Sequence, residues 1–505
     1  MNTKSSDLFN KEGYISLREY VEDINYMRER GPWKLPLRIS DKAQLFFLGC
    51  IVKYSWFESA IYMKHDSWYS PAYSIIINHL KKYRILDNVH QEDSFFKDFS
   101  YVSAARNISI NNTTFIMSGY SAERDIEVAL SKSLGEIIER MISGIYDNNK
   151  TDFVNSPKVV QKKYKVVYPP KYHRFLKVQQ DAYRELQHNP NVPFGWVKGM
   201  NLITKENTYI PRHITSWFGY AEARTLKEKL VDQTSNGCAG YFTREGATLR
   251  ALLEGVSRDG FFVYWLTRTA PQIIQQDTLP IHIKEIVSEF ASRGITLYLL
   301  DVMSLAIPSV YVVAINHDGD VPKVVVSGSA GVTYEDAIIA ALNEMVMIGT
   351  AFYEEKKNMN IKTNPKPFLS DINSSTRRLY WQGKEKVEQL RWFISGKEVS
   401  YAEISMFDFG DKAEDGSKFS DIQKLKVVLN TLENQGEDYY PVVYYPKNKL
   451  QEALGFYIAQ VYIPKAFPLY LRECYGTFDS DRLEEFAASK NIKNWELNEE
   501  PHMFN

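Results

Sequence analysis

Apolar residues in the first hundred positions recur at steps of three and four, which is the spacing of a helix with one buried face. Two segments show it clearly: SLREYVEDINYMRER (16–30) and SPAYSIIINHLKKYRIL (70–86). We therefore predict a small, mainly helical accessory domain over residues 1–100. The second segment, which follows Ser-Pro and ends in basic residues, also fits the recognition helix of a winged-helix domain. A packed helical cap is the simpler interpretation.

From about residue 101 the pattern changes to short β-branched runs that alternate with helical segments, which predicts an α+β domain over residues 101–470. In SVYVVAINHDGDVPKVVVSGSAG (309–331) two β-branched runs flank an Asp-Gly pair, a sequence typical of a tight hairpin turn. The polar, proline-containing stretch near 354–378 is predicted to be a loop or insertion. Residues 471–505 are predicted to be a C-terminal tail, ordered only where it docks.

One helical phrase occurs three times in this domain. It reads EVALSKSLGE at 127–136, EGATLRALLE at 245–254 and EDAIIAALNE at 335–344, each with a glutamate seven residues after an alanine. Seven residues are close to two helical turns, so both positions lie on one face. The copies are too far apart and too unevenly spaced for a solenoid. We predict three equivalent glutamate-bearing helices packed on β-sheets in one fold.

These glutamates have two explanations. Arg140 and Arg258 follow Glu136 and Glu254 by four residues, so simple ion pairs along each helix would satisfy the acids. Alternatively the carboxylates converge, and converging carboxylates repel one another unless cations lie between them. Hard divalent ions with oxygen ligands suit that role, and Mg²⁺ commonly bridges to a nucleotide's phosphates. Three copies of one design favour convergence.

Composition and charge narrow the classes of function. The 505 residues include 61 Lys and Arg against 62 Asp and Glu, a net charge of −1, so no general affinity for nucleic acid or anionic membrane is expected. No stretch reaches the roughly 18 apolar residues of a membrane span. Cys50, Cys238 and Cys474 have no paired spacing, which favours a reducing compartment. We expect a cytoplasmic protein.

Three segments identify a family resemblance. SLGEIIER (133–140), SNGCAG with the helix that follows (235–268) and GSAGVTYEDAIIAALNE (328–344) resemble the helical motifs of YcaO-domain proteins. The likeness extends from about 115 to 468 and is strongest to the cyclodehydratases of azole- and azoline-forming ribosomal peptide pathways, such as the thiazole/oxazole-modified microcins. It implies the YcaO fold, with ATP and Mg²⁺ as cofactors.

The resemblance also implies site residues. Positions matching the family's magnesium-holding glutamates are Glu136, Glu139, Glu254 and Glu344, and positions matching its nucleotide contacts are Ser235, Asn236, Gly237, Arg140 and Arg258. Backbone amides of the glycine-containing loop at 235–237 would meet phosphate oxygens. No catalytic side chain is assigned, because the attacking nucleophile belongs to the substrate.

The activity implied is cyclodehydration of a ribosomal precursor peptide. A Cys, Ser or Thr side chain attacks the preceding backbone carbonyl, ATP phosphorylates the resulting oxyanion, and phosphate leaves to give a thiazoline or oxazoline. The chain has no evident E1-like domain, so a separate leader-binding protein is the expected partner, and a flavin-dependent dehydrogenase would complete azole formation. A homodimer is compatible with this scheme.

Several positions depart from the family pattern. Phe242 stands where an asparagine is usual, Gly246 where a second glutamate is usual, and Ala340 and Met347 where arginine and glutamine are common. The final residues hold one proline, Pro501, where azole-forming members often have a proline-rich tail. Two alternatives therefore stay open: a catalytically degenerate YcaO-fold scaffold or peptide-binding protein, and an enzyme that makes thioamides or amidines by the same amide activation.

Overall fold

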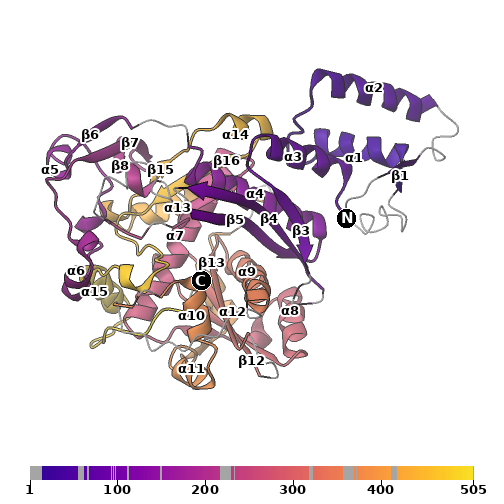
Figure 1. The fold of residues 1–505 in the computed structure, drawn as a ribbon. Helices are drawn as coiled ribbons and strands as arrows, with labels where there is room; N and C mark the ends of the chain where they lie inside the picture. The colour runs from indigo at the N-terminus through magenta and orange to yellow at the C-terminus, as the bar shows by residue number, and fades with distance from the viewer. Residues whose placement is uncertain are drawn as a thin grey trace.

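The described part of the chain forms four β-sheets surrounded by helices (Figure 1). The computed structural model describes residues 14–54, 62–64, 68–92, 94, 96, 98–110, 113–147, 151–215, 229–232, 234–317, 322–355, 369–370, 372–410 and 418–503. No helix within these ranges is long and apolar enough to cross a membrane.

The N-terminal region contains three helices and a small sheet. Helices α1 (Leu17–Glu29) and α3 (Pro71–Lys82) confirm the two predicted helices, and α2 (Ile39–Tyr54) lies between them. Strands β1 (Tyr14–Ser16) and β2 (Tyr62–Lys64) pair antiparallel and were not predicted. A capping box starts α1, since Ser16 Oγ accepts from Glu19 N at 3.2 Å and the Glu19 carboxylate accepts from Ser16 N at 2.8 Å.

The N-terminal helices share a hydrophobic core with the rest of the chain. Met27 and Leu80 belong to the same buried cluster as Leu130 and Ile138 of α4 (Ile126–Gly144), the first glutamate-bearing helix. Trp33 joins the two parts, because its indole stacks on Phe456 with ring centroids 5.0 Å apart and its Nε1 donates to Ser131 Oγ at 2.9 Å. The accessory region is therefore packed against the predicted 101–470 domain.

Replacing Trp33 with alanine should loosen this junction. The side chain is 1% exposed, and emptying a buried tryptophan site costs about 3 kcal/mol or more. Hydrogen exchange should show faster exchange in α1 and α3, with the larger part of the chain less affected. Tyr26→Ala, at a side chain on α1 that is 59% exposed, is the control, and equal loosening by both changes would contradict the assignment.

A three-stranded antiparallel sheet forms the wall above α4. It consists of β3 (Asn88–Glu92), β4 (Ser100–Ile110) and β5 (Thr113–Glu123), in that order. Helix α4 packs on β5 and β4. Since β3 pairs with β4, this sheet begins at residue 88, before the position near 101 where the character of the sequence changes.

A five-stranded sheet has the order β13-β12-β11-β10-β14. Its long strands are β11 (Ile295–Asp301), β12 (Ser309–Asn316) and β13 (Val324–Ala330), and its short ones are β10 (Gln272–Ile274) and β14 (Glu398–Val399). The predicted hairpin strands β12 and β13 pair antiparallel, while the Asp-Gly pair between them lies outside the described residues. The helices α9 (Tyr334–Glu355) and α8 (Ile281–Ala291) pack on this sheet.

A six-stranded antiparallel sheet completes the core. Its path is β6-β7-β15-β16-β9, with β8 paired to β7. The strands are β6 (Phe153–Asn155), β7 (Phe194–Asn201), β8 (Asn207–Pro211), β9 (Cys238–Tyr241), β15 (Val442–Tyr444) and β16 (Tyr457–Tyr462). Helix α7 (Arg244–Leu266) packs on β16 and β9 and also contacts β13, so it lies between two sheets. The three repeats are thus helices α4, α7 and α9.

Shorter helices cover the remaining surface. They are α5 (Pro157–Val160), α6 (Lys177–Ala182), α10 (Ser374–Tyr380), α11 (Lys384–Gln389), α12 (Tyr401–Ile404), α13 (Asp421–Glu433), α14 (Lys449–Leu454) and α15 (Ser480–Ser489). The prediction of a loop near 354–378 is wrong at its end, where α10 begins with an Asn373 side-chain cap on Thr376 N. Residues 356–368 lie outside the described residues.

The end of the chain docks against the core. The indole nitrogens of Trp265 and Trp381 donate to the carbonyl oxygens of Glu500 and Pro501 at 3.3 and 3.1 Å. His502 is fully buried and its Nε2 donates to Tyr470 O at 3.0 Å. These contacts hold residues 500–503 in place, and the preceding α15 packs on α7.

Candidate functional site

The glutamates of the three equivalent helices meet at one cleft. Glu136 and Glu139 from α4, Glu254 from α7 and Glu344 from α9 all line an open hollow with about 2390 Å³ of empty space. It lies beside the three-stranded sheet, with α10 on the opposite side. The fold therefore brings the repeated carboxylates together, as the three repeats predicted.

Each of the three repeated glutamates (Glu136, Glu254 and Glu344) is oriented by a backbone amide from the segment that precedes its own helix. In every case the donor lies 16 or 17 residues earlier in the chain. The pairs are Tyr120 N with Glu136 Oε2 at 2.6 Å, Gly237 N with Glu254 Oε2 at 3.1 Å, and the Gly328 amide with Glu344. A fourth amide, Gly240 N, donates to Glu139 Oε2 at 2.8 Å. The strand–helix units are equivalent in their polar contacts as well as in their sequence.

Burial and mutual repulsion disfavour the charged form of three of these acids, Glu139, Glu254 and Glu344. Burial, together with the neighbouring carboxylates of Glu254 and Glu136, raises the pKa of Glu139 well above its usual range. Burial raises the pKa of Glu254 to about 7, with Arg258 opposing the rise and Glu344 adding to it. Burial also raises the pKa of Glu344. A cation among them would relieve this cost of ionisation.

Two arginines partly neutralise the cluster. Arg140 Nη2 lies 2.5 Å from Glu136 Oε1, and Arg258 Nη2 lies 3.2 Å from Glu254 Oε1 and 3.8 Å from Glu344 Oε1. Both side chains line the cleft. The ion pairs along the helices, considered from the sequence as an alternative to convergence, therefore coexist with it.

The carboxylates fit magnesium ions carried by a nucleotide better than an all-protein metal cage. Across the described ranges, no three His, Cys, Asp or Glu side chains are grouped closely enough to hold a metal by themselves. Magnesium usually takes one or two carboxylates and completes its shell with waters and phosphate oxygens. An all-oxygen donor set of partly buried carboxylates suits that arrangement, in which Glu136, Glu139, Glu254 and Glu344 would supply the protein ligands.

The three residues of the loop at 235–237 differ in whether they line the cleft. Ser235 lines it, whereas Asn236 faces a second cavity of about 780 Å³ that also contains His173 and Phe467. Gly237 acts through its backbone, which holds Glu254. Among the predicted nucleotide contacts, Ser235 and the two arginines face the carboxylates, and Asn236 does not.

Gly237→Ala should disturb the site through the backbone alone. Gly237 has a φ of +70°, and an added Cβ would lie 2.4 Å from Val461 O. Strain at such a position and displacement of the loop should lower the free energy of unfolding by about 1–3 kcal/mol. The loss of the bond to Glu254 should also weaken nucleotide binding. Calorimetric titration with ATP and Mg²⁺ measures the second effect, and Gly410→Ala, which also replaces a glycine with positive φ but in open space, is the control.

Two departures from the family pattern have structural reasons. Phe242 packs edge-on against Trp33 with ring centroids 5.0 Å apart, so it helps to hold the N-terminal helices. Gly246 has no room for a side chain, because a Cβ there would lie 2.2 Å from the Tyr241 ring and 2.5 Å from Asp421 Oδ2. A second glutamate at position 246 would require this region to be rearranged.

The other two substituted positions lie beside the acids. Met347 lines the main cleft, and Ala340 lines an adjoining hollow of about 990 Å³. That hollow shares Glu254, Arg258 and Glu344 with the main cleft. Glu254 and Glu344 therefore border both the main cleft and the adjoining hollow.

Much of the cleft wall carries no recognisable motif. One face of the three-stranded sheet contributes alternate residues, namely Asn88, His90, Glu92, Tyr101, Ser103, Asn107, Ser118 and Tyr120, and α10 contributes Ser374, Ser375 and Arg378. Alternation along β3 and β4 was the only sequence signal for this wall. Arg378 was missed because it falls within the predicted loop.

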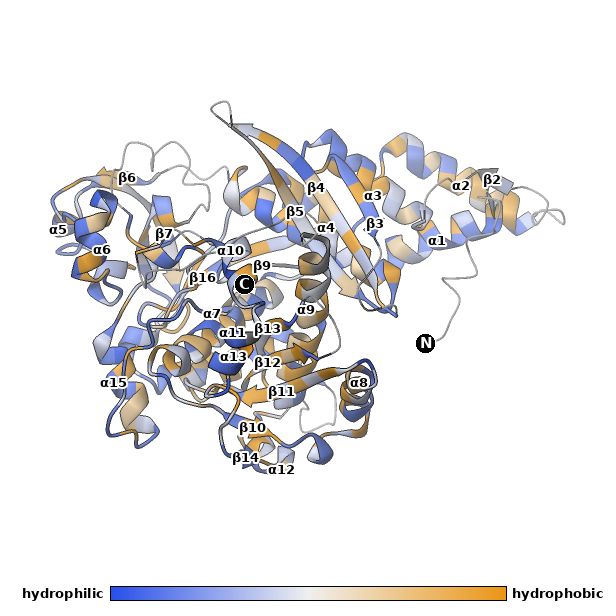
Figure 2. Cartoon of the chain, turned by 60° about the horizontal axis from the view of Figure 1, so that its bottom comes forward, coloured by the Kyte–Doolittle hydropathy of each residue, from blue (hydrophilic) through white to orange (hydrophobic). Residues whose placement is uncertain are grey.

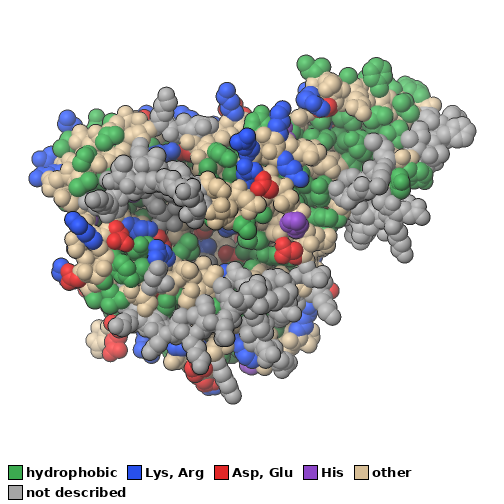
Figure 3. All heavy atoms as spheres, viewed as in Figure 1, with side chains coloured by type: hydrophobic (Ala, Val, Ile, Leu, Met, Phe, Trp, Pro, Cys, Tyr) green, Lys and Arg blue, Asp and Glu red, His purple; other side chains and the backbone are tan. Residues whose placement is uncertain are grey.

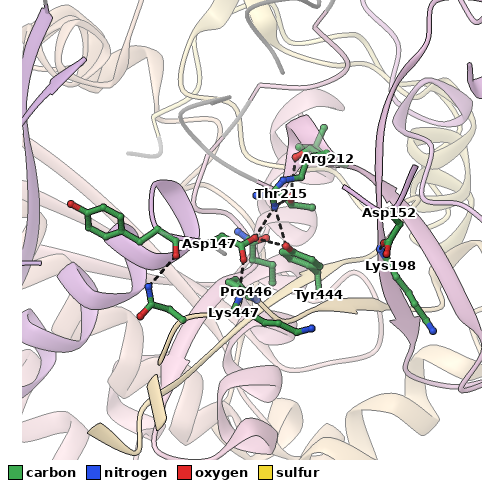
Figure 4. Close-up of polar contacts among 12 residues, drawn as sticks. Asp147, Asp152, Lys198, Arg212, Thr215, Tyr444, Pro446 and Lys447 are labelled. Carbon is green, nitrogen blue, oxygen red and sulfur yellow. Dashed lines mark hydrogen bonds and ion pairs between the residues drawn. The ribbon is translucent and has the colours of Figure 1, made fainter. Parts of the chain in front are cut away.

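A buried polar cluster anchors the end of α4 to the six-stranded sheet (Figure 4). The Asp147 carboxylate, 3% exposed, accepts from Arg212 Nη1 at 2.7 Å, from Lys447 N at 2.9 Å and from the Tyr444 hydroxyl. Arg212 also donates to Thr215 Oγ1 at 3.1 Å. This cluster fixes the position of the helix that carries Glu136 and Glu139.

An α+β fold with three glutamate-bearing helices around one cleft defines a class of protein. The family model for YcaO, described as an ATP- and Mg²⁺-binding cyclodehydratase, matches residues 111–466. The chain belongs to the YcaO family, as the resemblance predicted, and the predicted cofactors ATP and Mg²⁺ are those of this family.

Solved structures share the fold at low sequence identity. A heterocyclase in complex with substrate and cofactor aligns with 16% identity and a TM-score of 0.61, over 85% of this chain and 57% of its own. The heterocyclase TruD aligns with 15% identity and a TM-score of 0.57, over 75% and 51% of the two chains. YcaO from Methanopyrus kandleri bound with AMPPCP and Mg²⁺ aligns with 15% identity and a TM-score of 0.53, over 79% and 92%.

The chain thus spans little more than half the length of the two heterocyclases. A comparison with curated protein sequences finds no match.

Proposed function

We propose that this chain is an ATP- and Mg²⁺-dependent cyclodehydratase component that converts Cys, Ser or Thr residues of a ribosomal precursor peptide into thiazolines or oxazolines. The observation that carries the proposal is the convergence of Glu136, Glu139, Glu254 and Glu344 on one open cleft. Membership of the YcaO family supports it.

The cleft residues would act by binding and positioning the nucleotide. Arg140, Arg258 and the Ser235 loop lie where they can meet phosphate oxygens, and the four glutamates would hold magnesium, which neutralises phosphate charge. The substrate's thiol or hydroxyl adds to the preceding amide carbonyl, and the oxyanion takes the γ-phosphoryl group of ATP to release ADP. Expulsion of phosphate then forms the ring with net loss of one water.

The size of the cleft and the solved structures support the proposed substrate and partners. The cleft is open along the polar face of β3 and β4, where an extended peptide could lie. A structure of the E. coli microcin synthetase McbBCD complex with pro-MccB17 bound aligns with a TM-score of 0.50 and 15% identity. A leader-binding E1-like protein, and a flavin-dependent dehydrogenase for azoles, are accordingly the partners we propose.

Equilibrium binding of ATP to the purified full chain tests the nucleotide step. Affinity in the presence of Mg²⁺ should exceed that in EDTA by at least about tenfold, because the metal joins the nucleotide to the acids. Ring formation is then followed by mass spectrometry of candidate precursor peptides incubated with ATP and partner proteins. Failure to bind Mg²⁺-ATP, alone and with partners, would contradict the proposal.

A catalytically degenerate YcaO-fold scaffold is the second candidate. The observation that favours it is the filled space at Gly246, where Tyr241 and Asp421 exclude the glutamate common in the family. A scaffold would bind a peptide or a homologous enzyme in the absence of ATP. The scaffold function would be excluded if a peptide lost water when this chain was the sole YcaO protein present. Thioamide or amidine formation would use the same activation of the peptide amide. The mass of the modified peptide distinguishes these products from a thiazoline or oxazoline.

A further inference from the structure

Helix α2 is largely exposed although it is apolar around most of its circumference. Leu45 is its one buried residue, whereas Ile39, Phe46, Phe47 and Tyr54 are between 67% and 87% exposed. Figure 1 shows α2 at the outer edge of the molecule, much of its ribbon has hydrophobic colours in Figure 2, and hydrophobic side chains gather there in Figure 3. A helix that is apolar all round is normally buried, so this one needs a cover.

The exposed apolar positions of α2 are spaced symmetrically along the helix. At 100° per residue one outward face collects Ile39, Ala43, Phe46, Phe47, Cys50 and Tyr54. The steps between them are four, three, one, three and four, which read the same in both directions. An antiparallel copy centred between the two phenylalanines therefore brings every outward position level with another outward position. The level pairs would be Ile39 with Tyr54, Ala43 with Cys50, and Phe46 with Phe47.

We propose that α2 forms a two-fold symmetric interface with α2 of a second copy of this chain. The exposed parts of the large side chains on this face, Ile39, Phe46, Phe47 and Tyr54, amount to roughly 600 Å² per copy, taking about 200 Å² for each fully exposed side chain. That is at the upper end of the largest apolar patches of typical monomers, about 300–600 Å², and is about three quarters of the roughly 800 Å² per partner of a stable interface. A two-fold interface uses the same patch on both copies, so the symmetrical spacing suits it.

A lipid surface fits this face less well. Membrane-binding helices surround their apolar side with many basic residues, whereas α2 carries Lys42 and Lys53 and, in its first turn, Asp41. The interface is independent of the function proposed for the cleft, because the outward residues of α2 are absent from the cleft's lining.

Sedimentation velocity of the full chain over about 1–100 µM tests the interface. The parent chain should sediment at twice its mass of 58.5 kDa, and Phe46→Glu should weaken self-association by about a hundredfold or more, because it places a charge in the apolar centre. The matched control is Phe407→Glu, which makes the same change at a side chain that is 54% exposed and outside α2. It should leave the dimer unchanged.

A disulfide tests the register. Ala43→Cys places a thiol level with Cys50 of the second copy, so mild oxidation should link the chains through positions 43 and 50. In the parent chain the two Cys50 residues would be about 10 Å apart along the helix axis, too far to bridge. Cys238 and Cys474 are buried. The parent should therefore stay unlinked, and peptide mapping identifies the bond.

Several results would overturn the proposal. A parent chain that is monomeric throughout, or a dimer that Phe46→Glu leaves intact, would show that another surface or occupant is involved. Linking of the parent through Cys50 would show that the helices do not pair in the antiparallel register. If the monomer instead bound phosphatidylglycerol vesicles through Phe46 and Phe47, the face would belong to a lipid surface.

Discussion

Glu254→Gln should weaken binding of Mg²⁺-ATP by about tenfold to a hundredfold and slow ATP turnover at least as much. Glutamine keeps the size of the side chain and can still accept from Gly237 N, but it removes the negative charge that would hold a magnesium ion. The cluster contains Arg258, whose guanidinium would then face fewer acids. Calorimetric titration with ATP at fixed Mg²⁺ measures the effect.

The control variant must separate the effect of the lost charge at Glu254 from an effect on folding. Glu285→Gln makes the same substitution at an exposed position of α8, outside the lining of the cleft, and should bind Mg²⁺-ATP as the parent does. Titration of both variants with ATP in EDTA shows how much of the difference depends on magnesium. Equal Mg²⁺-ATP affinity in Glu254→Gln and the parent would remove the metal role assigned to this glutamate.

Asp259→Ala should lower the free energy of unfolding by about 3–5 kcal/mol. The Asp259 side chain is fully buried and pairs with Arg482 of α15, through Nε at 3.1 Å and through Nη2. It also accepts from Phe467 N at 3.0 Å and Ser304 Oγ at 2.8 Å. Alanine would leave the buried guanidinium of Arg482 without its partner, which is why the cost exceeds that of a lost hydrogen bond.

Chemical denaturation of the parent, of Asp259→Ala and of a control variant checks this expectation. The midpoint of unfolding should fall clearly for Asp259→Ala and stay close to the parent for Glu484→Ala, an exposed acid on the same helix as Arg482. Similar midpoints for both variants would mean that this buried pair adds little to stability.

The features most readily predicted from the sequence were those encoded within single segments. The triple repeat predicted the helices α4, α7 and α9, because periodicity and small residues are local properties of the chain. It also predicted that Glu136, Glu254 and Glu344 would share one cleft. The family motifs predicted Ser235 and the two arginines at the same place. Whether these residues bind nucleotide and metal stays a prediction.

What the sequence did not show depends on contacts between distant segments. KVVYPP at 165–170 has the composition of a strand, yet it makes one isolated bridge from Val166 to Tyr209 of β8 and then continues as a 3₁₀ turn at Pro169–Lys171, because two successive prolines cannot donate to a strand ladder. Asn236 adjoins Ser235 but faces a different cavity, since the turn at Gly237 rotates the loop. Arg378 reaches the cleft through the docking of α10, for which the sequence offers no motif.

The bond between each repeated carboxylate (Glu136, Glu254 and Glu344) and an amide 16 or 17 residues earlier lies within a single strand–helix unit. The orientation of each repeated glutamate is decided within its own unit, and the bond from Gly240 N to Glu139 joins the first unit to the second. Segments joining the units can then lengthen or shorten without turning a carboxylate away from the cleft. This accounts for glutamates at 136, 254 and 344, which lie 118 and 90 positions apart, each keeping its bond to an amide of its own unit. Insertions between units should therefore be tolerated far better than single insertions inside one.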